Sequence, residues 1–472
     1  MGLKNNYIPE KVKKIHMIAA CGTGMGALAC MLQDLGYDVT GSDQDVYPPM
    51  SDFLKAKGIK LFKGFNPDNI DPATDLVVVG NAVFKTNLEA VATMDRNIAF
   101  CSMPQALNFF AAAGKKIILV TGTHGKTTTS SLMAHVLNEA GLDPSFMIGG
   151  IVKDFGGNYR IGRGDFIVIE GDEYDTAFFD KGPKFMHYSP HITIITGVEF
   201  DHADIFRDLD HVRQIFTTFV QGLSKESLVL AYGDDVNLDG ILLHCGCNIQ
   251  RYGDNAGEWA CAGINVRDGK SVFKVKDPQG KEMELTTHLM GHHNIMNALA
   301  VIAASKKINI PDRILADALM SFSGIKRRQE VRGVKNGITV MDDFAHHPTA
   351  VRETLKAVRP FYTKGRIIAV FEPRTNSSMR AVFQKIYPES FDGADLVCVR
   401  RPSKIEKIPV GERLSPEQLV LDICERGIDA FLFDDTDAII DFLVRGAEKN
   451  DLMLIMSNGG FDNIHARLLE RL

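Results

Sequence analysis

The segment from Lys116 to Thr129, which reads KIILVTGTHGKTTT, constrains the fold of this chain more than any other. An apolar strand runs into a glycine turn, and a lysine and several hydroxyl side chains then open a helix. In such a turn, the backbone N–H groups of Gly122 to Lys126 face a triphosphate. Lys126 reaches the β/γ oxygens, and the Thr127 hydroxyl ligates Mg²⁺. The segment therefore predicts a nucleotide-binding loop in an α/β fold.

Length and composition bound the alternatives. The chain has 472 residues, which exceeds one ordinary core and favours about three domains. With 45% apolar residues, 24% charged residues and a net charge of −6, it offers no electrostatic case for nucleic acid or an anionic membrane. Its eight cysteines lack paired C-x-x-C spacing, which argues against zinc and favours a reduced, cytoplasmic protein. We find neither a signal-peptide pattern nor an apolar run of membrane-spanning length.

Strands and helices alternate along the chain in three blocks, which is the pattern of parallel sheets covered by helices. We expect block boundaries near residues 113 and 325. The expected strands outside the phosphate-loop segment are Lys14–Ala20, Tyr37–Thr40, Asp75–Val79, Asp165–Glu170, Ile192–Val198, Gly337–Met341, Arg366–Phe371, Asp395–Val399 and Asp451–Met456. A helix is expected from about Asn294 to Lys307.

A second glycine-rich turn follows the first strand. Gly22, Gly24 and Ala27 satisfy G-x-G-x-x-G/A, and Asp43 lies where a ribose-binding acid belongs. This pattern alone is consistent with an NAD-linked oxidoreductase. The turn establishes only that a diphosphate can lie on a helix N-terminus, so a UDP-sugar fits equally well. A strand-to-helix turn without any ligand is the third interpretation.

Acidic and imidazole side chains stand at the ends of two expected strands in the second block. Glu170 ends one strand, and Asp201 and His202 follow another. Thr127 and Glu170 with a triphosphate would hold one Mg²⁺ ion, and His202 could serve a second ion nearer an acceptor. Imidazole is an unusual Mg²⁺ ligand, so His202 can also be a hydrogen-bonded loop histidine. The other acids of this region can be solvated loop charges: Asp172, Glu173 and Asp175. These residues indicate an Mg-ATP enzyme with a second nucleotide-like site.

Five motifs in this order resemble those of the Mur ligase family. They span Gly122–Thr129, Glu170–Asp175, Glu199–Asp204, Gly291–Ala298 and Asp342–Pro348. The phosphate loop also fits this family. Val120 stands where the strict P-loop pattern has glycine, and the shorter G-T-x-G-K-T form found here is typical of Mur ligases. The resemblance covers essentially the whole chain.

The resemblance implies three α/β domains and an amide-forming reaction. Residues 1–113 would be a Rossmann-like domain for a UDP-sugar, 114–325 a central P-loop ATPase domain with a mostly parallel sheet, and 326–472 a C-terminal Rossmann-like domain. The carboxylate of UDP-N-acetylmuramate would attack ATP to give an acyl phosphate, which an amine then attacks. Lys126 and the cofactor Mg²⁺ would offset the developing charge. No obligate protein partner is implied.

Within the family, the chain is similar to the branch that attaches the tripeptide L-alanyl-γ-D-glutamyl-meso-diaminopimelate in peptidoglycan recycling. Four segments carry this similarity: Gly41–Ser51, Phe200–Phe206, Glu372–Arg380 and Met456–Phe461. The branch that adds L-alanine during biosynthesis usually reads Pro-His-Arg-Phe-Thr-Arg in the third of them. That branch is the nearest alternative. A sensor that binds the UDP-sugar and hydrolyses ATP slowly is another.

The resemblance also assigns site residues. The residues implied to bind ATP are Gly122, Thr123, His124, Gly125, Lys126, Thr127, Thr128, Asn294, Asn297, Arg328 and Asp343. The implied metal ligands are Thr127, Glu170 and His202, and the implied catalytic residues are Lys126, Glu170, His202 and His346. The residues implied to bind the UDP-sugar are Gly22, Thr23, Gly24, Met25, Gly26, Ser42, Asp43 and Asn81.

The motifs identify the residues that bind the acceptor peptide and the second metal ion less specifically. Arg374 is the preferred partner for the peptide carboxylates, followed by Arg380, and Arg400 and Arg401 are alternatives. Several relatives place a carbamylated lysine some fifteen residues after the metal-site histidine. Here the segment Arg213–Phe219 contains no lysine, so a second metal must be supported differently.

Overall fold

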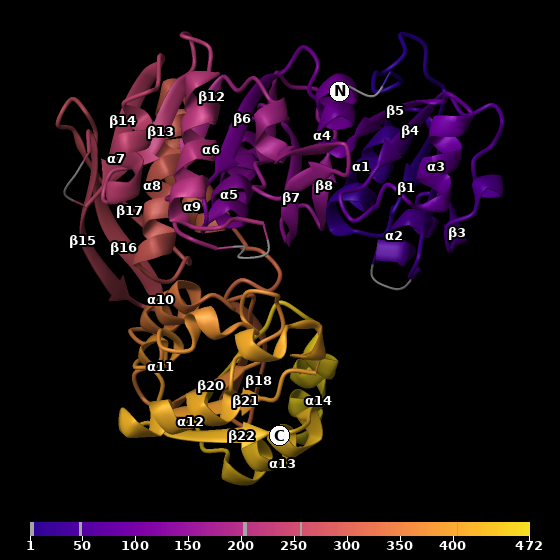
Figure 1. Cartoon of the computed structure of the whole chain (residues 1–472). Coiled ribbons are helices and arrows are strands. Elements are labelled where there is room, and N and C mark those ends of the chain that lie inside the picture. The colour runs from indigo at the N-terminus through magenta and orange to yellow at the C-terminus, as the bar shows by residue number, and fades with distance from the viewer. Residues whose placement is uncertain (1–3, 47–49, 202–204, 255–256, 404) are drawn as a thin grey trace.

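The structure, a computed structural model, describes residues 4–46, 50–201, 205–254, 257–403 and 405–472. Three α/β domains follow one another along the chain (Figure 1). The N-terminal domain, in indigo, lies beside the magenta central domain, and the orange and yellow C-terminal domain lies below them. This architecture confirms the expected fold class, whereas the boundaries at 113 and 325 stay predictions.

The N-terminal domain has a five-stranded, fully parallel sheet in the order β3-β2-β1-β4-β5. Its strands are β1 (Lys14–Ile18), β2 (Asp38–Asp43), β3 (Lys60–Lys63), β4 (Leu76–Val79) and β5 (Ala99–Ser102). Its helices are α1 (Thr23–Asp34), α2 (Met50–Ala56), α3 (Leu88–Asp95) and α4 (Met103–Ala106). The continuous apolar run of β4 is fully buried, as expected for a central strand covered on both faces.

The central domain has a ten-stranded sheet in the order β17-β16-β15-β14-β13-β12-β6-β9-β7-β8. The strands are β6 (Lys116–Thr121), β7 (Ser145–Val152), β8 (Gly157–Arg160), β9 (Phe166–Glu170), β12 (Ile192–Ile195), β13 (Leu228–Tyr232), β14 (Asn248–Gly253), β15 (Trp259–Arg267), β16 (Lys270–Lys276) and β17 (Glu282–Thr287). A separate hairpin pairs β10 (Asp175–Ala177) with β11 (Asp180–Pro183). The ten-stranded sheet is parallel in its middle and antiparallel at both ends.

Helices cover both faces of this sheet. They are α5 (Lys126–Glu139), α6 (Leu209–Gln221), α7 (Val236–Leu242), α8 (His292–Lys307) and α9 (Asp312–Ser321). Along β6, Ile118 and Val120 pack in the core formed with α5, α8 and α9, whereas Ile117 and Leu119 face the opposite core. Successive strand residues point to opposite faces, so the apolar run before the phosphate loop is buried on both sides.

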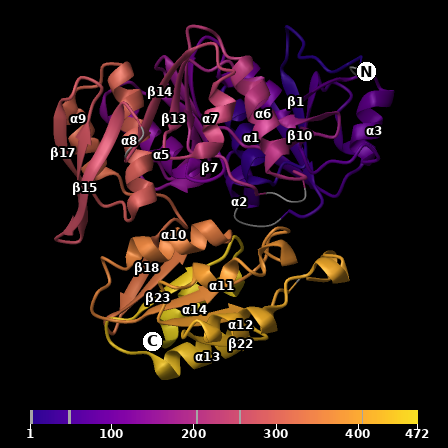
Figure 2. The same ribbon diagram turned by 60° about the vertical axis from the view of Figure 1, so that its left-hand side comes forward.

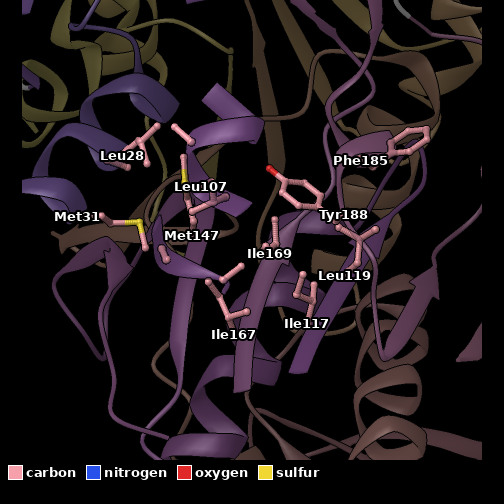
Figure 3. Close-up of a cluster of buried hydrophobic side chains, with 14 of the residues drawn as sticks. Leu28, Met31, Leu107, Ile117, Leu119, Met147, Ile167, Ile169, Phe185 and Tyr188 are labelled. Atoms are coloured by element: carbon pink, nitrogen blue, oxygen red, sulfur yellow. The ribbon is translucent and has the colours of Figure 1, made fainter. Parts of the chain in front are cut away.

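The second of these cores continues into the N-terminal domain. Figure 3 shows Leu28 and Met31 of α1 beside Met147 of β7 and Ile167 and Ile169 of β9. All five side chains are buried within one hydrophobic cluster. The N-terminal and central domains therefore share a hydrophobic core.

The C-terminal domain has its own hydrophobic clusters and a six-stranded sheet in the order β18-β19-β23-β20-β21-β22. Only the β18–β19 pair is antiparallel. Its strands are β18 (Glu330–Lys335), β19 (Ile338–Asp343), β20 (Ile367–Phe371), β21 (Leu396–Arg400), β22 (Asp429–Phe433) and β23 (Leu452–Met456). Its helices are α10 (Pro348–Val358), α11 (Tyr387–Ser390), α12 (Pro416–Glu425), α13 (Thr436–Gly446) and α14 (Ile464–Arg471). In both overall views α10 lies on the side that faces the central domain (Figures 1 and 2).

The eight cysteines are free thiols. Within the described residues, no helix has both the length and the apolar composition needed to cross a membrane.

Candidate active site

The phosphate loop joins the end of β6 to the start of α5, as expected for a nucleotide-binding turn. Gly122 and Gly125 have φ values of +123° and +81°, which lie in the region that favours glycine. A Cβ at Gly122 would lie 2.5 Å from Thr196 Oγ1, and one at Gly125 would lie 2.5 Å from Asn297 Oδ1. The loop therefore needs glycine at both positions.

Lys126 is held within the loop by a carboxylate. Its Nζ donates to the carbonyls of Gly122 and Thr123 at 2.6 and 3.0 Å and to Glu173 Oε1 at 3.0 Å. Burial lowers the pKa of Lys126, but the charge and hydrogen bond of Glu173, together with the charges of Glu170 and Asp172, raise it above its usual value. Glu173 is only 5% exposed, so its interpretation as a solvated loop charge was wrong.

The two predicted metal ligands in the described part of the chain lie together. Thr127 Oγ1 donates to Glu170 Oε1 at 2.9 Å, and the Gly149 N–H donates to Oε2 at 2.7 Å. Burial raises the pKa of Glu170, although the Gly149 N–H, Lys126 and the Thr127 hydroxyl each act to lower it. Hydroxyl and carboxylate oxygens are the donors that Mg²⁺ prefers, so this pair fits a magnesium ion. His202, the third predicted ligand, lies outside the described residues.

Two asparagines on α8 border the loop. Asn294 and Asn297 are buried, and Asn297 Nδ2 donates to Asn294 Oδ1 at 3.2 Å. Asn294 Nδ2 also lies 3.2 Å from Gln329 Oε1, and the Gln329 N–H donates to Asp343 Oδ2 at 2.8 Å. The structure thus links three of the predicted ATP residues across the domain junction. Arg328 lies over the Phe344 ring, 4.8 Å from its centroid, in the same region.

Residues from the C-terminal domain reach the phosphate loop. Thr349 Oγ1 donates to Glu199 Oε2 at 2.9 Å, and His124 Nε2 lies 3.4 Å from the same oxygen. Burial raises the pKa of Glu199, but contacts with His124 and Thr349 lower it to about 2. Burial and the neighbouring His124 lower the pKa of His347 to about 4. Sequence reasoning gave no role to Glu199, His347 or Thr349, although all three lie within or beside its motifs.

His346 contacts other residues of the C-terminal domain. Its Nδ1 is 2.9 Å from the Phe344 carbonyl, and its own carbonyl accepts from Tyr387 Oη at 2.5 Å. Burial lowers the pKa of His346, which leaves the imidazole neutral at pH 7. Its catalytic role stays a prediction.

The acceptor arginines separate into two groups. Arg374 and Arg400 approach Glu372 Oε1 at 3.7 and 3.8 Å, and Arg400 also pairs with Asp462 Oδ2 at 3.0 Å. Glu372 is 2% exposed and accepts from Ser457 Oγ at 2.6 Å. Arg380 pairs instead with Glu412, and Arg401 pairs with two other surface acids. The structure therefore gathers Arg374 and Arg400 around one buried acid that sequence reasoning missed.

The glycine-rich turn of the N-terminal domain lies against the central domain. The Thr23 carbonyl accepts from Asn158 Nδ2 at 3.4 Å, and a Cβ at Gly24 would meet Met147 at 3.8 Å. Asp43 Oδ2 accepts from the Cys21 N–H at 2.8 Å, which braces the turn. The remaining residues predicted to bind the UDP-sugar include exposed Gly22 and Asn81 and buried Met25 and Gly26.

Ser42 does not face the turn with its side chain. It is buried, and its hydroxyl donates to the buried carboxylate of Glu89. A direct contact of Ser42 with a UDP-sugar stays a prediction, and it would have to involve the backbone.

Known families and proteins match this chain over nearly its whole length. Residues 14–115 match the Mur ligase family catalytic domain, 120–305 the Mur ligase middle domain, and 327–459 the Mur ligase glutamate ligase domain. The chain belongs to the Mur ligase family. This Mur ligase is thus an ATP-dependent ligase, and the NAD-linked oxidoreductase suggested by Gly22 to Asp43 is not supported.

The relatives of this Mur ligase come from two branches. It is 38% identical over 462 residues to the UDP-N-acetylmuramate–L-alanyl-γ-D-glutamyl-meso-2,6-diaminoheptandioate ligase of Escherichia coli K12, covering 97% of this chain and 98% of that one. It is 32% identical over 465 residues to a UDP-N-acetylmuramate–L-alanine ligase of Clostridium botulinum, covering 96% and 97%. A crystal structure of a murein peptide ligase from Psychrobacter arcticus matches with a TM-score of 0.72 and 33% identity, covering 97% of this chain and 98% of that one.

Proposed function

We propose that this Mur ligase joins UDP-N-acetylmuramate to L-alanyl-γ-D-glutamyl-meso-diaminopimelate, with ATP as co-substrate, in peptidoglycan recycling. The carrying observation is the full-length identity of 38% to the Escherichia coli ligase of that name, against 32% to the L-alanine ligase. The proposal includes a cytoplasmic location, where ATP and the UDP-sugar are available, and no obligate protein partner.

Phosphoryl transfer would begin at the phosphate loop. Lys126 now donates to the Glu173 carboxylate at 3.0 Å. It would donate to the γ-phosphate instead when ATP binds, because phosphate oxygens are anionic acceptors of the same kind. Thr127 and Glu170 would hold Mg²⁺, which supplies positive charge against the phosphate oxygens when it is bound. Asn294 and Asn297 would contact the adenine, and Arg328 and Asp343 would hold phosphate and ribose. These four residues lie around one junction of the central and C-terminal domains.

The UDP-sugar would bind at the glycine-rich turn, with its pyrophosphate at the N-terminus of α1. Gly22 and Thr23 are exposed there and leave the backbone open to a ligand. The lactyl carboxylate would extend toward the central domain, attack the γ-phosphate of ATP and become an acyl phosphate. ADP leaves in that step, and the terminal alanine amine of the peptide then expels inorganic phosphate.

The peptide would bind at the group around Glu372. A tripeptide that ends in diaminopimelate carries several carboxylates, and arginine binds carboxylates through paired N–H groups. Arg374 and Arg400 both point their guanidinium groups toward the Glu372 region. This arrangement supports a larger, more acidic acceptor than L-alanine.

The deciding experiment supplies the purified protein with Mg-ATP, UDP-N-acetylmuramate and either L-alanine or the tripeptide. Phosphate release and the UDP-linked product are followed together, the latter by mass spectrometry. Turnover with the tripeptide alone is the expected result. Turnover with L-alanine alone would place the chain in the biosynthetic branch, and phosphate release without an amide product would identify a sensor.

A further inference from the structure

Three metal-ligating side chains meet at the junction of the central and C-terminal domains. His124 lies in the phosphate loop, Glu199 follows β12, and His347 caps the N-terminus of α10. Each offers one ligand atom, and these atoms lie within 4.8 Å of one another. The two imidazole ring centroids are 5.0 Å apart.

One of the two imidazoles presents a ring nitrogen without a partner. Nε2 of His347 is buried and has no hydrogen bond, whereas the buried Nε2 of His124 lies 3.4 Å from Glu199 Oε2. His347 is only 7% exposed, so water does not readily replace the missing partner. Buried polar atoms are nearly always paired, and a metal ion would satisfy the unpaired ring nitrogen of His347 next to an imidazole and a carboxylate.

We propose that His124, Glu199 and His347 form a site for a divalent transition-metal ion of the zinc type, which bridges the two domains. Two imidazole nitrogens and one carboxylate oxygen are a common three-ligand set for Zn²⁺, with a fourth position left open. Magnesium prefers oxygen ligands, so this site differs in chemistry from the pair Thr127 and Glu170. The cysteine spacing that argued against zinc does not bear on it, because no thiolate takes part.

Small side-chain movements would complete the geometry. Bonds of about 2.0–2.2 Å place tetrahedral ligand atoms roughly 3.4 Å apart, so the present limit of 4.8 Å requires a short inward shift. His347 Nδ1 accepts the Thr349 N–H at 3.3 Å. Coordination through Nε2 moves the ring proton to Nδ1 and gives up this long contact.

The site would couple the metal to the position of the C-terminal domain. His124 and Glu199 belong to the central domain and His347 to the C-terminal domain, so one ion fastens both. His124 also belongs to the loop proposed to bind ATP phosphates. Ion binding would therefore restrain this loop, and the proposed metal site does not depend on which acceptor the enzyme uses.

The test is a titration of the metal-free, full-length protein with Co²⁺, whose visible absorption reports low coordination numbers, followed by displacement with Zn²⁺. One equivalent of Co²⁺ is expected to give the absorption. Glu199→Gln and His347→Gln should each weaken Zn²⁺ binding by at least about 100-fold, since outer-shell changes alone cost 10–100-fold. Circular dichroism establishes that both variants fold.

Two matched controls locate the ion. His244→Gln changes an exposed histidine, and His202→Gln removes the histidine predicted for the magnesium site. Both are expected to keep the absorption. Loss of the signal in His202→Gln with retention in His347→Gln would assign the metal to the other site and overturn the proposal. Absence of stoichiometric Co²⁺ and Zn²⁺ binding in the unmodified protein would overturn it as well.

Discussion

The carboxylate of Glu173 lies 3.0 Å from the ammonium nitrogen of Lys126, so the lysine that would bind phosphate already binds an anion of this chain. The pair is buried, and it must separate before Lys126 can reach a nucleotide. The structure therefore places a competitor for phosphate within the phosphate loop.

Glu173→Gln is expected to tighten ATP binding about tenfold, or by about 1.4 kcal/mol, because a neutral amide holds Lys126 less strongly. Calorimetric titration with Mg-ATP, without the UDP-sugar, measures the Kd. Asp175→Asn is the matched control, since Asp175 is an acid of the same segment that pairs with Lys181 at 2.9 Å. Weaker ATP binding in Glu173→Gln would mean that Glu173 supports the bound nucleotide.

Lys126→Ala should reduce turnover by roughly 10³-fold or more, because the ammonium group offsets charge on the transferred phosphoryl group. Binding of the UDP-sugar should change by less than about twofold, since its proposed turn lies in another domain. Phosphate release measures the first quantity, and fluorescence or calorimetric titration measures the second. Equal loss of both would contradict the assignment of the two sites to separate domains.

Arg374→Ala is expected to raise the KM for the tripeptide about 10- to 100-fold, the range for losing a charged hydrogen bond. The KM for ATP should stay within about threefold, because Arg374 lies outside the phosphate-loop region. Arg401→Ala is the control, as Arg401 pairs with Asp434 and Glu417. An unchanged peptide KM in Arg374→Ala would remove this residue from the acceptor site.

Stability is expected to fall in acid through His293. Burial lowers its pKa to about 4, below the usual 6.5, so the folded state binds fewer protons than the unfolded chain between these pH values. The free energy of unfolding should therefore drop as the pH falls from about 6.5 to 4, by about 3 kcal/mol from this group. Urea unfolding of the protein and of His293→Gln across this range measures it. A pH dependence identical in both would exclude His293 as the source.

Leu28→Ala should lower the free energy of unfolding by about 2–5 kcal/mol, the usual cost of emptying a packed core site. Leu28 is fully buried in the cluster shared by two domains. Hydrogen exchange should therefore speed up in both the N-terminal and central sheets. Leu35→Ala, at a partly exposed position nearby, is the control. Faster exchange in the N-terminal sheet alone would show that the two domains unfold independently.

The fold was largely predictable from local patterns. Apolar runs such as Ile367–Phe371 and Leu452–Met456 are strands because parallel sheets bury both strand faces, and this signal is strong in a single sequence. The antiparallel strands β15 to β17 were not predicted individually. In β16, for example, buried residues alternate with more exposed ones, so this short segment resembles many polar surface segments.

Site residues were predictable where a contiguous motif fixes the backbone conformation. They were not predictable where two contacting residues come from distant segments of the chain. Gly122 to Thr127 follow from local sequence, since turn, helix and hydroxyl are contiguous. Glu173 resembled a loop charge because nothing local reveals that Lys126 lies 47 residues away in sequence and 3.0 Å away in space. The approach of Thr349 to Glu199 likewise depends on how two domains pack, which no short motif records.

The shared core beneath α1 and β9 fixes the distance between two proposed binding sites of the enzyme. Because Leu28, Met31, Ile167 and Ile169 are packed in one cluster, the span from the glycine-rich turn to the phosphate loop is set by side-chain packing and not by a hinge. The enzyme would then select a sugar nucleotide by its length as well as by its chemical groups. One whose carboxylate falls short of the loop could bind tightly and still never be activated.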